Sequence, residues 1–119
     1  MGKDILSEGK RRERDMIRHI VMFELLEEAE GRSRLENREL AKEKAEALRE
    51  KVPGLKAYQV VTNAPEADQT NYDIALICDF EDMDGLNAYQ VHPEHKAFGA
   101  FITKVRKSRA CIDYEMGNN

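Results

Sequence analysis

The sequence predicts an α+β fold in which an antiparallel sheet carries its helices on one face. Three observations support this prediction. Runs of β-branched and apolar residues alternate with amphipathic helical stretches, their order is strand, helix, strand, strand, helix, strand, and 119 residues suffice for one small core. This order is typical of the ferredoxin-like fold.

The first firm element follows a polar start. Residues 1–15 contain a short basic cluster and no hydrophobic periodicity, so we expect a mobile extension before a domain that spans 16–116. The run IRHIVMFELL then predicts a strand with apolar residues on both faces. Because strand side chains alternate, His19 shares one face with Ile17, Val21 and Phe23.

The first helix is marked at both ends. Ser33 and Glu36 form a capping-box pattern, and Pro53 with Gly54 stops the helix. Between them the apolar positions recur at helical spacing: Ala41, Ala45, Leu48 and Val52. This stripe is narrow, so the helix should lie on the sheet with most of its circumference in water.

The remaining elements follow in order along the chain. They are strands at 55–63 and 71–80 joined by a loop, a short helix at 83–91, a second helix at 93–105, and a last strand at 108–115. Pro93 suits the first turn of the second of these helices.

Helices on one face leave the other face of the sheet uncovered. That face is predicted to carry apolar side chains: Ile20, Met22, Ala75 and Ile77. A second copy of the chain, packed sheet against sheet around a two-fold axis, would cover them. We therefore expect a homodimer.

Composition excludes several classes of protein. The net charge is −4 and basic residues are interleaved with acidic ones, which argues against nucleic-acid binding. No apolar run reaches the ~18 to 20 residues of a membrane span. Cys78 and Cys111 are far apart and have no zinc-type spacing, so we expect a cytoplasmic protein without disulfide or metal.

One stretch, LNAYQVHPEH, concentrates the residues that carry chemistry. It contains Tyr89, His92 and His95, and the chain has one other histidine, His19. A neutral imidazole can accept a proton and a tyrosine hydroxyl can donate one. The structural alternatives are a helix cap for His92, a packed, hydrogen-bonded His95 and a buried, satisfied Tyr89.

The segments IRHIVMF, VPG, YDIALICDF, LNAYQVHPEH and SRACIDYE resemble, in order, the stress-responsive dimeric α/β-barrel (Dabb) family. The resemblance spans about a hundred residues, from Met16 to Glu115. It implies a ferredoxin-like protomer and a homodimer whose two sheets form a barrel.

Within that family, the same stretch resembles olivetolic acid cyclase, a plant enzyme that closes a linear polyketide without cofactor or metal. The resemblance implies catalytic roles for Tyr89 and His95. It also implies a pocket that contains His19 and Asp113, which can meet on neighbouring strands. The further ligand-binding candidates are His92, Arg109, Val21, Phe23 and Leu76.

Arg109 departs from the resemblance, because the plant enzyme has an apolar pocket there. It can hold a ligand carboxylate or pair with Asp113 or Asp79. The sequence thus favours a protein that binds a small carbonyl or aromatic metabolite, with cofactor-free conversion as the further expectation. The alternatives are a pocketless stress-stability dimer and a monooxygenase-type member of the barrel superfamily.

Overall fold

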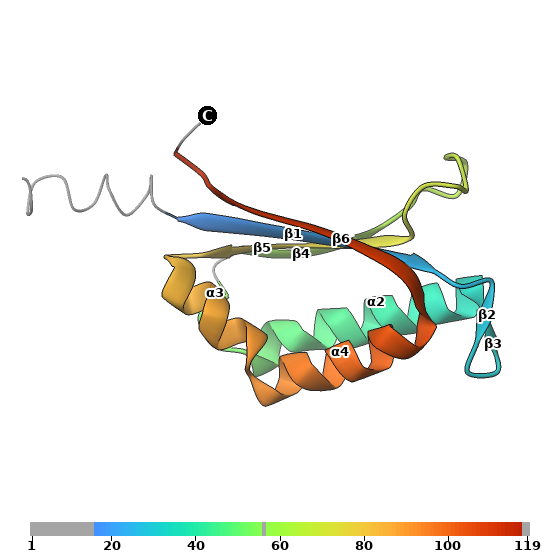
Figure 1. The fold of residues 1–119 in the computed structure, drawn as a ribbon, viewed down its shortest axis with the longest axis horizontal. Coiled ribbons are helices and arrows are strands. Elements are labelled where there is room, and N and C mark those ends of the chain that lie inside the picture. The colour runs from blue at the N-terminus through green and yellow to red at the C-terminus, as the bar shows by residue number, and fades with distance from the viewer. Residues whose placement is uncertain (1–15, 56, 118–119) are drawn as a thin grey trace, which may run out of the picture.

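The computed structural model describes residues 16–55 and 57–117, so the predicted extension at 1–15 lies outside the described residues. The main sheet is antiparallel and has four strands in the order β4-β5-β1-β6. The strands are β1 (Ile17–Leu25), β4 (Ala57–Thr62), β5 (Ile74–Phe80) and β6 (Arg106–Glu115). Helices α2 (Arg34–Lys51), α3 (Met83–Gln90) and α4 (Pro93–Val105) lie on one side of it (Figure 1). The predicted ferredoxin-like α+β fold is confirmed.

Strand β1 is central, and its side chains alternate as predicted. The buried row faces the helices and consists of Ile17, His19, Val21, Phe23 and Leu25. It packs with the inward residues of β5: Ile74, Leu76, Cys78 and Phe80. His19 is the only polar member of the β1 row and is 2% exposed. Its environment is therefore the core rather than water.

The opposite face of the sheet is an apolar surface in the protomer. Ile20 lies between Ile77 of β5 and Ile112 of β6, and Met22 lies between two alanines of the same strands. Ile112 is 58% exposed. No helix among the described residues covers this face (Figure 1), as the sequence predicted.

Helix α2 begins and ends where the sequence indicates. The Ser33 side chain accepts from the Glu36 N–H, and Glu36 accepts from the Ser33 N–H, which completes the capping box. The helix packs on the sheet through small residues, and the hydroxyl of Tyr58 in β4 donates to the Ala45 carbonyl at 2.6 Å. None of the helices among the described residues combines the length and apolar character needed to cross a bilayer.

The sequence did not predict a small hairpin before α2. Strands β2 (Glu28–Ala29) and β3 (Arg32–Ser33) pair around Glu30 and Gly31, both at positive φ, as a two-residue turn of this kind requires. Asn37 holds the hairpin to α2, because its side-chain nitrogen donates to the Ala29 carbonyl at 3.0 Å. A Glu-Gly pair is a weaker hairpin signal than Asn-Gly.

A buried carboxylate ties α2 to the sheet. Asp73 is 0% exposed and accepts from the Leu25 backbone N–H at 2.7 Å, from Arg34 Nε at 2.9 Å and from Arg38 Nε at 3.0 Å. Burial by itself would raise the pKa of Asp73, but these hydrogen bonds outweigh burial and lower it. The helix thereby has a fixed position over the strands.

Candidate functional site

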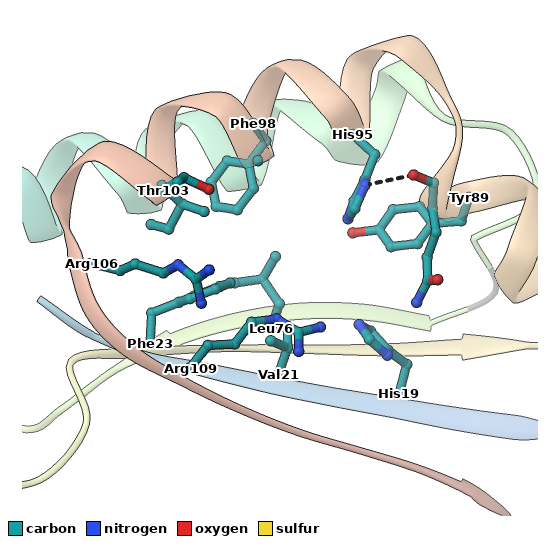
Figure 2. A pocket seen from close by; sticks show the side chains of 13 residues that line it. His19, Val21, Phe23, Leu76, Tyr89, His95, Phe98, Thr103, Arg106 and Arg109 are labelled. Atoms are coloured by element: carbon teal, nitrogen blue, oxygen red, sulfur yellow. Dashed lines mark hydrogen bonds between the residues drawn. The ribbon is translucent and has the colours of Figure 1, made fainter.

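A cavity of about 310 Å³ lies between the helix-covered face of the sheet and helices α3 and α4 (Figure 2). Its lining comes from β1, β5, β6 and both helices. Seven residues proposed from the sequence line it: His19, Val21, Phe23, Leu76, Tyr89, His95 and Arg109. The other two proposed residues, His92 and Asp113, do not.

The break between α3 and α4 brings Tyr89 and His95 together. His92 is the N-cap of α4, and its side chain accepts from the Glu94 N–H at 3.1 Å, so it has the capping role considered above. Pro93 follows at the first helical position. Across this bend the ring centroids of Tyr89 and His95 lie 4.4 Å apart.

His95 has the hydrogen bonding of a base. Its Nδ1 lies 3.2 Å from the Gln90 carbonyl oxygen. Because a carbonyl only accepts, Nδ1 carries the proton and Nε2 of the neutral ring keeps a free lone pair. Burial lowers the pKa of His95 below its usual 6.5, and nearby His19 and Arg109 lower it further. The hydrogen bond with Gln90 opposes this shift but is the smaller effect. The ring is therefore neutral at pH 7.

Tyr89 has the environment of a proton donor. It is 3% exposed, and its ring centroid lies 5.2 Å from that of Phe80. Burial raises the pKa of the Tyr89 hydroxyl well above its usual value, and the neighbouring Cys78 thiol contributes to the shift. The phenol thus keeps its proton, and Figure 2 shows its oxygen directed into the cavity beside His95.

His19 and Asp113 meet as the sequence suggested. They are directly opposite in the β1–β6 register, and His19 Nδ1 lies 2.6 Å from Asp113 Oδ1. The carboxylate accepts, so Nδ1 carries a proton. The His19 ring stands edge-on to Tyr89 with 6.3 Å between centroids. Three rings therefore gather at one end of the cavity.

Two arginines also line the cavity. Arg106 lies beside Thr103 at the end away from the rings, whereas Arg109 extends its guanidinium toward His19 (Figure 2). Within the described part of the chain, neither guanidinium has a carboxylate partner. Asp113 is bonded to His19, and Asp79 pairs with Arg18 at 2.8 Å. The ion pairs considered for Arg109 with these two aspartates are thus not formed.

Sequence reasoning missed six lining residues: Gln90, Phe98, Gly99, Ile102, Thr103 and Arg106. Five of them follow His95 at intervals of three or four residues, which places them on one face from α4 into the start of β6. Helical spacing counted from the proposed base, His95, is therefore the sequence signal that could have identified these five residues.

Cys111 joins the His19–Asp113 pair just outside the cavity lining. Its sulfur lies 3.6 Å from His19 Nδ1 and 3.8 Å from Asp113 Oδ1. Burial raises the pKa of this thiol, and the charge of Asp113 adds to the effect. These three side chains are the donors among the described residues that could hold a metal ion.

Comparison with known proteins places the chain in a family. The model of the stress responsive A/B barrel domain, Dabb, matches residues 17–116. The chain belongs to the Dabb family. Among curated proteins none matches this Dabb sequence. The family resemblance is therefore confirmed, whereas the closer resemblance to olivetolic acid cyclase stays a prediction.

Solved structures share the Dabb fold seen here. A dimeric ferredoxin-like protein of unknown function from Bacteroides fragilis is 33% identical with a TM-score of 0.69, over 84% of this chain and 95% of that one. A dimeric ferredoxin-like protein from Thermobifida fusca is 29% identical with a TM-score of 0.71, over 84% and 90%. Hydroxynitrile lyase from Passiflora edulis, 14% identical with a TM-score of 0.69 over 89% and 97%, shares the fold.

Proposed function

We propose that this Dabb protein binds a small carbonyl compound that carries a carboxylate, and converts it by cofactor-free acid–base chemistry of the polyketide-cyclase type. One observation carries the proposal. A single cavity is lined by a neutral imidazole and a phenol and by two guanidinium groups that have no carboxylate partner among the described residues. Its volume, about 310 Å³, suits a small ligand.

The ring end supplies the proton transfers. His95 Nε2 removes a proton from the carbon next to the ligand carbonyl, and the electron pair of that C–H bond moves into the enolate. The Tyr89 hydroxyl donates a hydrogen bond to the carbonyl oxygen as its negative charge grows. His19, which Asp113 orients, positions the ligand between them.

The two arginines of the lining determine which ligands bind. Arginine matches the geometry of a carboxylate, and its strongest contacts are paired, parallel hydrogen bonds. Arg106 and Arg109 would therefore bind the carboxylate of the ligand, while the apolar side chains of the lining contact its carbon chain. The two arginines distinguish the proposed ligand from a polyketide with an apolar tail.

We also propose that the working form is a homodimer whose two sheets form the α/β barrel. The relatives from Bacteroides fragilis and Thermobifida fusca are described as dimeric, and the helix-free face carries the apolar row Ile77, Ile20 and Ile112. Burial of that row in a partner would remove its apolar surface from water.

Two observations favour a binding protein over a pocketless stability dimer. The space beside Tyr89 and His95 is a cavity and is not filled by side chains. In addition, the Passiflora edulis hydroxynitrile lyase has this fold, so the fold is compatible with enzyme chemistry.

The test follows proton abstraction directly, without knowledge of the complete reaction. The protein is incubated in deuterated water with pyruvate, levulinate or phenylpyruvate, and loss of the proton signal next to the carbonyl is followed by NMR. We expect exchange above the buffer rate for at least one of these acids, and slower exchange for its neutral counterpart, which is acetone, 2-pentanone or phenylacetone respectively.

The variants separate proton transfer from carboxylate binding. His95→Gln should abolish catalysed exchange without loss of the fold. Arg109→Gln should slow the exchange of the keto acids and leave that of the neutral ketones unchanged. Exchange that equals the buffer rate with all three acids, together with no chemical-shift change on their addition, would refute the proposal.

A further inference from the structure

Three donor atoms on β1 and β6 converge at the edge of the sheet. His19 lies opposite Asp113, and Cys111 is two residues before Asp113, so all three side chains are on the helix-covered face. The distances between donor atoms are 2.6 Å from His19 Nδ1 to Asp113 Oδ1, 3.6 Å from Nδ1 to Cys111 Sγ, and 3.8 Å from Sγ to Oδ1. The cluster unites a nitrogen, a sulfur and an oxygen.

The arrangement differs from a nucleophilic cysteine–histidine–aspartate triad. In such a triad the histidine uses one ring nitrogen toward the nucleophile and the other toward the carboxylate. Here Cys111 and Asp113 both approach the same nitrogen, Nδ1 of His19. Three donor atoms that lie close to one another can surround a metal ion. They are not arranged to pass a proton along a chain, as the atoms of a triad are.

We propose that His19, Cys111 and Asp113 bind one zinc ion per protomer. Tetrahedral zinc with sulfur at about 2.3 Å and nitrogen or oxygen at about 2.0 to 2.2 Å separates its ligand atoms by roughly 3.3 to 3.6 Å. The two distances to sulfur are already close to that range, and only the nitrogen–oxygen distance must open, by about 0.7 Å on these bond lengths. Small side-chain rotations at an edge strand achieve this.

Charge and accessibility agree with the site. A thiolate and a carboxylate neutralise the two positive charges of the ion. Cys111 and Asp113 are exposed, so solvent can deliver the metal, while His19 is held in the core. Three protein ligands leave the fourth position for water, as in zinc sites that bind substrates.

Binding has a defined proton balance. The thiol proton of Cys111 goes to solvent, and the metal takes the place of the proton on His19 Nδ1. The metal-bound neutral ring must then carry its proton on Nε2, so this nitrogen is a hydrogen-bond donor when the ion is bound. This inference goes beyond the proposed function, in which His95 and Tyr89 act without a metal.

The test measures metal directly and does not depend on activity. Full-length protein is stripped with a chelator, dialysed against zinc sulfate and analysed for zinc content. In parallel it is titrated with cobalt chloride and followed by absorption spectroscopy. We expect one metal per protomer and the charge-transfer band of a thiolate bound to tetrahedral cobalt.

Matched variants identify the ligands. Cys111→Ser should remove the charge-transfer band, and Asp113→Asn should weaken zinc binding by more than about 100-fold, the upper range for loss of an outer-shell partner. The controls Cys78→Ala and His92→Asn alter the other cysteine and another histidine and should leave both signals unchanged. Circular dichroism verifies that each variant is folded.

Two results would overturn the inference. One is less than half a zinc per protomer after dialysis. The other is stoichiometric metal that remains in Cys111→Ser with the charge-transfer band intact, which would place the ion elsewhere.

Discussion

Replacement of Asp73 by asparagine should cost much of the stability of the fold. The carboxylate is fully buried and accepts hydrogen bonds from the Leu25 backbone, Arg34 and Arg38. The variant leaves Arg38, which is 6% exposed, without a carboxylate, and its amide NH2 group must face another donor, either a guanidinium or the Leu25 N–H. Removal of one partner of a buried ion pair costs about 3 to 5 kcal/mol. The expected fall in melting temperature is roughly 12 °C or more at about 4 °C per kcal/mol.

The matched control is Asp79→Asn. Asp79 also accepts two hydrogen bonds from one arginine, but the side chain of that arginine, Arg18, is 34% exposed, so water can solvate it when the carboxylate is removed. We expect a loss of about 1 kcal/mol there. The chain contains no tryptophan, so unfolding in urea is followed by circular dichroism, at one protein concentration because dimerisation affects stability.

The pH dependence gives a second readout of the same prediction. The pKa of Asp73 is lowered in the folded protein, so its contribution is present above the unfolded value of about 3.9 and is lost as pH falls through the folded pKa. The stability difference between wild type and Asp73→Asn should therefore shrink below about pH 4. Equal losses in the free energy of unfolding for Asp73→Asn and Asp79→Asn at neutral pH would refute the reasoning.

Further predictions concern the site and the outer face. Catalysed exchange should rise as pH increases through the lowered pKa of His95 and be level at neutral pH; a rise centred above pH 7 would exclude His95 as the base. Tyr89→Phe should weaken ligand binding by about 1 to 3 kcal/mol with unchanged circular dichroism, and unchanged affinity in titrations would contradict this. Ile112→Asp should convert a dimer to a monomer in light scattering, whereas a persistent dimer would place the interface elsewhere. Iodoacetamide should modify exposed Cys111 and spare Cys78, whose pKa burial raises to about 12, as peptide mass spectrometry can determine.

The parts of the fold that the sequence predicted depend on local periodicity. The two-residue alternation in β1 identified both faces of the sheet, and the Ser33 box and Pro93 marked helix starts. Pairing of His19 with Asp113 was anticipated because first and last strands are neighbours in this fold.

The parts that escaped prediction depend on tertiary register. The partners of Asp73 come from a strand end and a helix that are distant in sequence, so no local pattern announces them. Cys111 became a neighbour of His19 only when the β1–β6 register was known, since 92 positions separate the two residues. Of the two arginines that line the cavity only Arg109 was predicted, because Arg106 ends a helix where a charged residue is ordinarily solvated.

Strand β1 presents the cavity on one side and the proposed partner surface on the other. His19 and Val21 line the cavity, while Ile20 and Met22, interleaved with them, face outward. Insertion or deletion of one residue within β1 would exchange the two rows and damage both surfaces at once. Substitution has no such consequence, because alternate positions can change independently. During evolution, the residues that bind the ligand and the residues that bind the partner can therefore change independently, while the length of this strand stays constant.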